Sequence, residues 1–286
     1  MTTPAFAALL WLGTFPPLPV LVIGVVTAFA GYTAVYALND VVGYHSDREK
    51  FLQGAFSDGG TDLDAVLVRH PMAQGYLSLA EGLAWSLGWG VVAFAGAWLL
   101  NPVCVLIFVV GCLLEAGYCL MWRVSPYRAL VSGAVKTLGA VAAVFAVDPN
   151  PSPVFLAILF LCLFFWEIGG QNVPNDWADI AEDRRFGGQT IPICLGLDIS
   201  REIILGSILL SLALVGTLFQ LAQGSNAPLF GAVAVSAVTW LMLPKTLKLY
   251  FEGGHDQAMG LFNRASYFPP MLFALALVRV FFSGLA

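Results

Sequence analysis

Long apolar segments are the feature that most constrains this chain. Eight of them approach the ~20 residues that a helix needs to cross the hydrocarbon core of a membrane. A shorter apolar stretch, 4–14, precedes them and predicts either an incomplete first span or a helix at the membrane interface. Only 11% of the residues are charged, against about 25% in soluble domains. The sequence therefore predicts an all-α membrane protein, a bundle of about nine transmembrane helices. The long spans are expected near 17–42, 76–99, 102–122, 127–147, 152–175, 202–222, 227–248 and 264–284.

The basic residues lie almost entirely on one side of this predicted bundle. Of the 13 Lys and Arg residues, 11 fall in the connections 43–75, 123–128, 176–201 and 245–264. The alternate connections hold none, and the positive-inside rule assigns the basic side to the cytoplasm. We expect an integral inner-membrane protein of a bacterium or archaeon, with the mouth of any active site facing the cytoplasm. No basic block predicts nucleic-acid binding.

The chain is expected to form one polytopic membrane domain, residues 1–286, with cytoplasmic cap segments at about 43–75, 176–201 and 249–263. Its five cysteines lie mostly in apolar runs and lack CxxC spacing, so they predict core packing rather than disulfides or a metal site. The N-terminus lacks the basic region and the small-residue cleavage site that would predict a signal peptide. The oligomeric state stays open.

Two stretches of one pattern end long apolar runs on the predicted cytoplasmic side. NDVVGYHSD begins at Asn39, and NDWADIAED begins 136 residues later at Asn175. Spacings of three, four and seven residues keep side chains on one face of a helix. If each helix continues through its motif, it presents a stripe of oxygen ligands. These ligands are Asn39, Asp40 and Asp47 in the first stripe and Asn175, Asp176, Asp179 and Asp183 in the second.

Carboxylates this close repel one another unless a cation lies among them. Several hard oxygen ligands suit Mg²⁺, which keeps some of its waters and shares substrate phosphates, with Mn²⁺ as the alternative metal. Two facing stripes can hold such ions around a diphosphate, and the apolar bulk beside them can accept a hydrocarbon tail. The pattern therefore predicts a substrate with a diphosphate head and an isoprenoid tail. For one isolated Asp, a solvated acid at a helix end is the favoured interpretation, but two matched motifs on one membrane face argue against it.

These motifs resemble those of the UbiA-type intramembrane prenyltransferases, over nearly the whole chain. That family carries an NDxxDxxxD motif after its second helix and a DxxxD motif after its sixth. NDVVGYHSD resembles the first, and DIAED, within NDWADIAED, resembles the second. Three further elements are similar to the family's G-x-x-T-[IL]-P, R-P-x-x-x-G and Y-x-x-x-K-R. They are GGQTIP at 187–192, RHPMAQG at 69–75 and YCLMWR at 118–123.

The resemblance implies a UbiA-like bundle of nine helices around a central cavity, with Asp-rich caps on the cytoplasmic side. It implies Mg²⁺-dependent transfer of a prenyl group from its diphosphate to a lipophilic acceptor, with quinone-precursor aromatics the commonest in the family. By position, Asn39, Asp40 and Asp47 are implied ligands of one metal, and Asp179 and Asp183 of the other. Asp176 is an additional candidate ligand. Glycerol-phosphate lipids, haem, chlorophyllide, sugar phosphates and carotenoids stay open as acceptors.

This sequence departs from the family pattern at three positions. Gly43 stands where the family usually has a metal-binding Asp, Trp122 stands in place of a Lys, and His70 intrudes between Arg69 and Pro71. The change at Gly43 leaves three readings. Asp40 and Asp47 can compensate, the first site can bind one metal weakly through water, or the chain can be a non-catalytic prenyl-lipid binder.

Other charged residues extend the candidate site. Arginine makes bidentate contacts with phosphate, so Arg69, Arg123 and Arg128 are candidates for the diphosphate, although the positive-inside rule alone would also supply them. Tyr118 is a candidate for placing substrate. Charges inside spans default to functional hypotheses. Lys136 and Glu167 are candidates for lining the substrate site, while a Lys136–Glu115 pair that only stabilises packing is the alternative. Arg279 is expected to extend its charge to the membrane interface.

The mechanism that we expect is ionisation-assisted alkyl transfer. Metal and arginine neutralise the departing diphosphate, an allylic cation forms away from water, and an electron-rich carbon of the acceptor attacks it. A cation-coupled transporter is the rival function, because intramembrane charges and an internal repeat are also expected there. Against a transporter, both motifs fall on one membrane face, and no span carries an unwound Gly/Pro pair at its middle.

Overall fold

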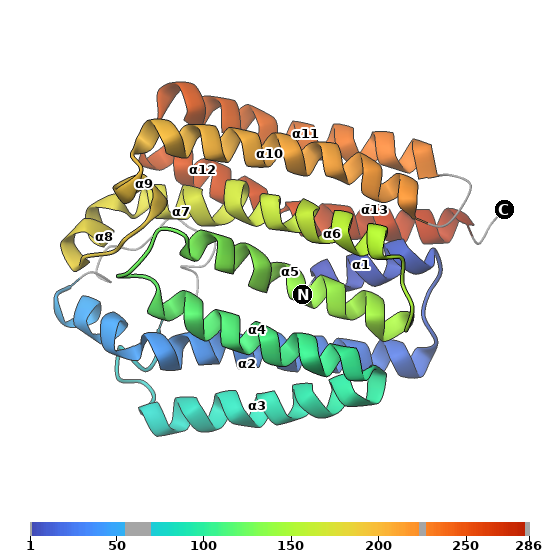
Figure 1. Ribbon diagram of the computed structural model, residues 1–286, viewed down its shortest axis with the longest axis horizontal. Coiled ribbons are helices and arrows are strands. Elements are labelled where there is room, and N and C mark those ends of the chain that lie inside the picture. The colour runs from blue at the N-terminus through green and yellow to red at the C-terminus, as the bar shows by residue number, and fades with distance from the viewer. Residues whose placement is uncertain (1, 55–69, 223–226, 284–286) are drawn as a thin grey trace.

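The computed structural model describes residues 2–54, 70–222 and 227–283, and throughout these residues the regular elements are helices (Figure 1). Eight helical segments are long and apolar enough to cross a membrane, and α1 is a shorter apolar helix. The prediction of an all-α membrane protein is thereby confirmed. The elements are α1 (Thr2–Leu12), α2 (Leu18–Leu52), α3 (Leu79–Leu100), α4 (Pro102–Leu120), α5 (Arg128–Val147), α6 (Pro153–Trp166), the π-helical turn η2 (Glu167–Asn172), α7 (Val173–Ala178), α8 (Ile180–Phe186), α9 (Ile191–Cys194), α10 (Leu197–Leu221), α11 (Ala227–Glu252), α12 (His255–Ala265) and α13 (Phe268–Ser283).

Helix α1 lies inside the bundle, so it is not an interfacial helix. It packs against α5 and α13, and Phe6, Ala7 and Leu10 are fully buried. Its C-terminal carbonyls lack partners within the helix. The Arg279 Nη1 of α13 donates to one of them, the Leu10 carbonyl, at 3.3 Å. The expectation that Arg279 reaches the membrane interface is wrong, because this side chain is only 2% exposed.

N-terminal capping residues mark the starts of α3 and α4, where the chain reverses direction. Ser78 accepts from the Glu81 backbone N–H, and the Glu81 carboxylate accepts from Ser78, which makes a capping box at the start of α3. Asn101 caps α4 in the same way through the Val103 N–H, and Pro102 occupies the first turn, where no N–H is needed. Asn101 thus ends α3 and starts α4. Helices α3 and α4 pack beside α2 (Figure 1).

Helix α2 is continuous for 35 residues and carries the whole first motif on its last turns. The second motif is built differently. The apolar run of α6 passes into η2, then α7, and breaks at Asp179 before α8 begins. The expectation of one regular helical stripe through Asn175, Asp179 and Asp183 is therefore wrong. Pro174 in the first turn of α7 explains part of this, because it has no N–H to donate to the preceding turn.

The end of α2 and the helices α7, α8 and α9 lie at the same end of the bundle, on the left in Figure 1. The α3–α4 and α5–α6 connections lie at the other end. The two motifs, far apart in sequence, therefore share one end of the molecule.

Candidate functional site

The two motif segments are joined directly by side chains. Lys50 Nζ on α2 lies 2.9 Å from Glu182 Oε1 on α8. Arg185 Nη2 on α8 donates to the Gln53 carbonyl, just past the end of α2, at 2.9 Å. We call the shared end the acidic mouth and define it by its carboxylates, Asp40, Asp47, Asp176, Asp179 and Asp183.

The first stripe gathers around a histidine. His70 Nδ1 lies 2.9 Å from Asp40 Oδ1 and 3.1 Å from Asp47 Oδ2. Among the described residues, these three form a His/Asp cluster with the spacing of a metal site. Asn39 lies on the same helix but turns to α4, where its Nδ2 donates to Glu115 Oε1 at 2.5 Å. The structure therefore brings Asp40 and Asp47 together and directs the Asn39 amide elsewhere.

The charge state of His70 depends on these two carboxylates. Burial would lower the pKa of the His70 imidazole, but hydrogen bonds to Asp40 and Asp47 outweigh burial and raise that pKa to about 9. A cation is thus favoured beside Asp40 and Asp47, whether it is an imidazolium or a metal ion.

The second stripe is more buried than the first. Asp176 is 2% exposed and Asp183 is 4% exposed. Arg128 Nη2 donates to Asp176 Oδ1 at 2.7 Å, and Asn175 Nδ2 donates to Asp179 Oδ2 at 2.9 Å. Burial, and then the negative charge of Asp176, raise the pKa of the Asp183 carboxyl to about 7, although Lys50 and Arg128 act in the opposite direction. Carboxyls in this setting gain most from an added cation.

Unsatisfied buried atoms test whether a metal and a diphosphate fit here. Asp176 Oδ2 and Asn172 Oδ1 are buried acceptors without a hydrogen-bond donor, and Arg128 Nε is a buried donor without an acceptor. Buried polar groups are nearly always paired, so these atoms mark a site built for a further partner. Two free oxygens fit a cation and one free guanidinium N–H fits an anion. The residues present therefore fit a divalent metal together with a phosphate group.

Of the residues predicted to contact the substrate, Arg128 and Tyr118 lie at the acidic mouth, whereas Arg123 does not. Arg128 lies in the mouth, and its guanidinium lies over the Tyr118 ring at 5.0 Å. The Tyr118 hydroxyl accepts from Asn172 Nδ2 at 3.4 Å. Arg123 is turned outward, because its side chain is 45% exposed and pairs with Glu49 at 2.6 Å. Arg69 lies outside the described residues.

The sequence reasoning missed Lys50 and Asn172, and it gave His70 no role in the site. Lys50 follows Asp47 by three residues on α2, so it continues the first stripe. Its Nζ also lies 4.2 Å from the centre of the Trp122 ring, the position where the family pattern has a Lys. Asn172 belongs to η2 and precedes the second motif by three residues. Helical spacing could have found Lys50, whereas the π-helical turn hides Asn172 from that argument.

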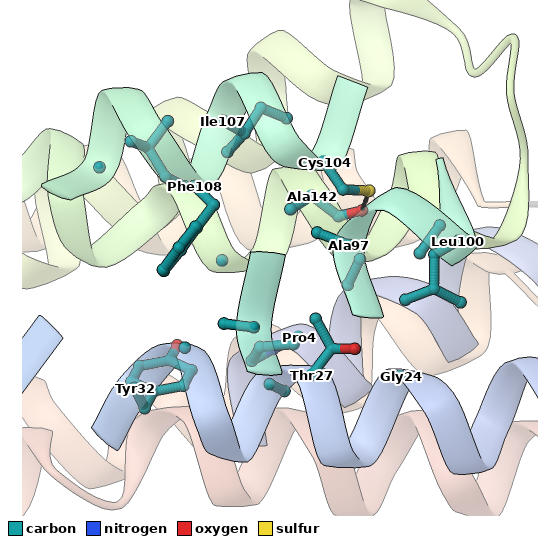
Figure 2. A pocket seen from close by; sticks show the side chains of 18 of the residues that line it. Pro4, Gly24, Thr27, Tyr32, Ala97, Leu100, Cys104, Ile107, Phe108 and Ala142 are labelled. Carbon is teal, nitrogen blue, oxygen red and sulfur yellow. Dashed lines mark hydrogen bonds between the residues drawn. The ribbon is translucent and has the colours of Figure 1, made fainter. Parts of the chain in front are cut away.

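An apolar cavity lies within the bundle, close to the first motif. It has a volume of about 250 Å³ and lies between α1, α2, α3, α4 and α5 (Figure 2). The polar end of the cavity is lined by Tyr36, Glu115 and Lys136. Tyr36 lies one helical turn before Asp40 on α2. Leu100 and Val147, at the far ends of α3 and α5, line the other end. None of the five carboxylates that define the acidic mouth lines this cavity, which runs from about one helical turn short of Asp40 toward the opposite end of the bundle.

Of the predicted substrate-lining residues, Lys136 lies in this cavity and Glu167 does not line it. Lys136 Nζ donates to Tyr36 Oη at 3.0 Å. Glu167 accepts from Ser132 Oγ at 3.0 Å and is 5% exposed. A second cavity of about 380 Å³ lies between α2, α3 and residues 71–77. Tyr32 and Tyr36 line both cavities, and Asp40 lines the second one.

The fold and the acidic mouth together define an all-helical membrane protein that gathers carboxylates over an apolar cavity. The sequence profile of the UbiA prenyltransferase family matches residues 1–267, so the chain belongs to this family. The resemblance seen in the motifs is confirmed, and with it the assignment of the chain to the intramembrane prenyltransferases. A search of curated proteins found no match.

Solved structures of family members share this fold. The apo structure of a UbiA homolog from Aeropyrum pernix K1 is 18% identical with a TM-score of 0.72, over 97% of this chain and 96% of that one. A digeranylgeranylglyceryl phosphate synthase structure is 14% identical with a TM-score of 0.70, over 97% and 91%. A UbiA homolog from Archaeoglobus fulgidus, bound to DMAPP and Mg²⁺, is 15% identical with a TM-score of 0.68, over 97% and 94%. At these identities the structures establish a shared fold.

Proposed function

We propose that this protein transfers an isoprenoid chain from a prenyl diphosphate to a lipophilic, aromatic acceptor of the quinone-precursor type, with Mg²⁺ as cofactor. One observation carries the proposal. Two acidic helix ends, joined by the Lys50–Glu182 ion pair, meet at one end of the bundle above an apolar cavity. Eleven of the 13 basic residues were assigned to this side, so we propose that the acidic mouth faces the cytoplasm.

The metal would be held by Asp40 and Asp47 at the first stripe and by Asp176, Asp179 and Asp183 at the second. The solved homolog with DMAPP and Mg²⁺ supports, by analogy, a metal together with a prenyl diphosphate in this fold. When bound, Mg²⁺ supplies positive charge that screens carboxylates and diphosphate from each other and stabilises the leaving group.

The protein's own residues supply the rest of the donor site. Arg128, with its unpaired Nε, and Lys50 provide positive charge for diphosphate oxygens at the mouth. The apolar cavity takes the isoprenoid tail and excludes water from the carbon that loses the diphosphate. This exclusion keeps the allylic cation available for the acceptor rather than for water.

Aromatic and polar side chains of the cavity take part in the transfer of the prenyl group. Tyr32, Tyr36 and Phe108 line this cavity. Each aromatic face that meets the allylic cation can stabilise it by up to about 2 kcal/mol in a dry site. Glu115 lies on the same cavity wall, and its carboxylate is the group that we assign to accept the proton that the acceptor carbon loses.

Purified protein with Mg²⁺, a labelled prenyl diphosphate and a panel of lipophilic acceptors tests the proposal. We expect diphosphate release and a prenylated product, and loss of both after chelation by EDTA. Asp183→Asn keeps the shape of the side chain but removes the charge, and should abolish turnover. No diphosphate release with any acceptor would contradict the proposal.

A non-catalytic prenyl-lipid binder is the second candidate, favoured by the missing carboxylate at Gly43. Such a protein would retain the prenyl diphosphate in a metal-dependent manner and release no diphosphate. Equilibrium binding of the donor, measured beside the turnover assay, separates the two functions.

A further inference from the structure

The first stripe lacks a carboxylate at position 43, and a histidine lies next to it. His70 comes from the segment that follows the described end of α2, not from α2 itself. Its Nδ1 nevertheless lies beside one oxygen of Asp40 and one oxygen of Asp47, at 2.9 and 3.1 Å. Three potential ligand atoms from two segments therefore converge on one point.

These separations match those of neighbouring ligands around one metal ion. In an octahedral site with metal–ligand bonds of about 2.1 Å, adjacent ligand atoms lie about 3 Å apart. Both His70–Asp distances meet this requirement, and all three ligand atoms lie within 4.8 Å of one another. The spacing of the three atoms is thus compatible with one shared metal ion.

The Asp47 side chain lies beside Gly43. A Cβ at position 43 would lie 2.9 Å from Asp47 Oδ2, so the Asp47 carboxylate already occupies the side that a longer residue would use. Since glycine at position 43 offers no side-chain ligand, a third ligand for the first stripe would come from another residue.

The backbone of His70 supports this role. Among the described residues other than glycine, His70 alone has a positive φ, 51°. A left-handed conformation at such a residue costs of the order of 1 kcal/mol and persists where the surrounding structure holds it, often at functional sites. Here it accompanies the placement of the imidazole against the two carboxylates.

We propose that His70 Nδ1 releases its proton to solvent and becomes a metal ligand at the first stripe, in place of the carboxylate that position 43 lacks. This inference rests on the metal-dependent function proposed above. It makes the first site a mixed Asp40, Asp47 and His70 site, whereas the ligands assigned to the second stripe are all oxygens. An imidazole nitrogen favours transition metals over Mg²⁺, so the first site should bind Mn²⁺ more tightly relative to Mg²⁺ than the second.

Pulsed EPR of the full-length protein loaded with Mn²⁺ tests the ligand directly. We expect modulation from a directly bound ¹⁴N nucleus, replaced by the ¹⁵N pattern when the protein is produced with ¹⁵N-histidine. Absence of histidine nitrogen coupling in the wild-type protein overturns the proposal, whatever the variants do.

His70→Ala should remove this coupling and weaken Mn²⁺ binding at the first site by about tenfold or more. His45→Ala is the matched control, because His45 is an exposed histidine inside the first motif, and it should keep the coupling and the affinity. Retention of the coupling in a folded, monodisperse His70→Ala protein overturns the proposal. Turnover is measured separately, so a prenyltransferase without nitrogen coupling refutes the ligand but not the proposed function.

Discussion

Lys50 lies between two groups of carboxylates and pairs the first motif segment with the second. It forms the ion pair with Glu182 and contacts the Trp122 ring. A charge in this position can bind the diphosphate when the substrate arrives, because phosphate oxygens compete with Glu182 for the ammonium group. Its role is therefore separate from that of Arg123, which is half exposed and pairs with Glu49.

We expect Lys50→Gln to weaken binding of the prenyl diphosphate about tenfold, which corresponds to about 1.4 kcal/mol. The measurement is the KM for the donor, together with its equilibrium Kd. Lys248→Gln is the control, since Lys248 is an exposed lysine on α11 paired only loosely with Glu252 at 3.8 Å. Equal donor affinity in the two variants would remove Lys50 from the diphosphate site.

The motif spacing predicted which acidic side chains form the acidic mouth, but not which residues those side chains contact. The positions of Asp40 and Asp47 follow from helical periodicity, whereas the helix that carries the second motif breaks at Asp179. The contact of Asn39 with Glu115 and the approach of His70 to Asp40 do not follow from helical periodicity, because each joins segments far apart in sequence. Local spacing carries no information on such contacts.

The η2 turn determines how closely neighbouring helices approach the second motif. A Cβ on Gly169 would lie 2.7 Å from Ser207 Cβ and 2.9 Å from the Ile204 carbonyl of α10. A Cβ on Gly170 would lie 2.7 Å from Ala265 Cβ of α12. The two glycines thus allow α10 and α12 to pack directly on the backbone just before Asn172.

We expect Gly169→Ala to destabilise the protein by about 1–3 kcal/mol, because a well-packed interface must open to accept the methyl group. The measurement is the midpoint of thermal unfolding in detergent. Gly206→Ala is the control on α10, where nothing lies within 4 Å of the added Cβ. That variant should unfold at the same temperature or higher, since alanine favours helix. A comparable loss of stability in both variants would refute the packing argument.

Most helices were predictable from apolar length, with ends within a few residues of those observed. The span predicted at 127–147, for example, is α5 (Arg128–Val147). The π-helical turn was not predicted, because the uniformly apolar run of α6 that leads into it shows no periodicity that could reveal an inserted residue. The sequence GGQNVP at 169–174 contains the available signal, two glycines followed by a proline that ends the regular ladder.

For the whole molecule, the apolar cavity determines which donors fit. Gly24 lines it on α2, toward the end remote from the mouth, and has nothing within 4 Å of an added Cβ (Figure 2). Apolar periodicity predicted which segments form helices, but the cavity walls depend on how five helices pack, which the sequence pattern does not reveal.

We expect Gly24→Phe to fill this part of the cavity and shift the preference of the enzyme toward shorter prenyl donors. The ratio of kcat/KM for a geranyl over a geranylgeranyl donor should rise about tenfold or more, since a few misplaced methylenes cost several kcal/mol. Gly88→Phe on α3 is the control, at a glycine that also has open space and does not line the cavity. An unchanged ratio in Gly24→Phe would mean that the tail lies elsewhere.

The length of α2 has a consequence for how substrates reach the protein. At 1.5 Å per residue its 35 residues span about 50 Å, whereas the oily interior of a bilayer is about 30 Å thick. Asp40 then lies near the level of the lipid headgroups and Asp47 above it. A donor dissolved in one leaflet already carries its phosphates at that height. Such a donor can diffuse laterally to the site without moving its diphosphate into the hydrocarbon core or its isoprenoid tail into water.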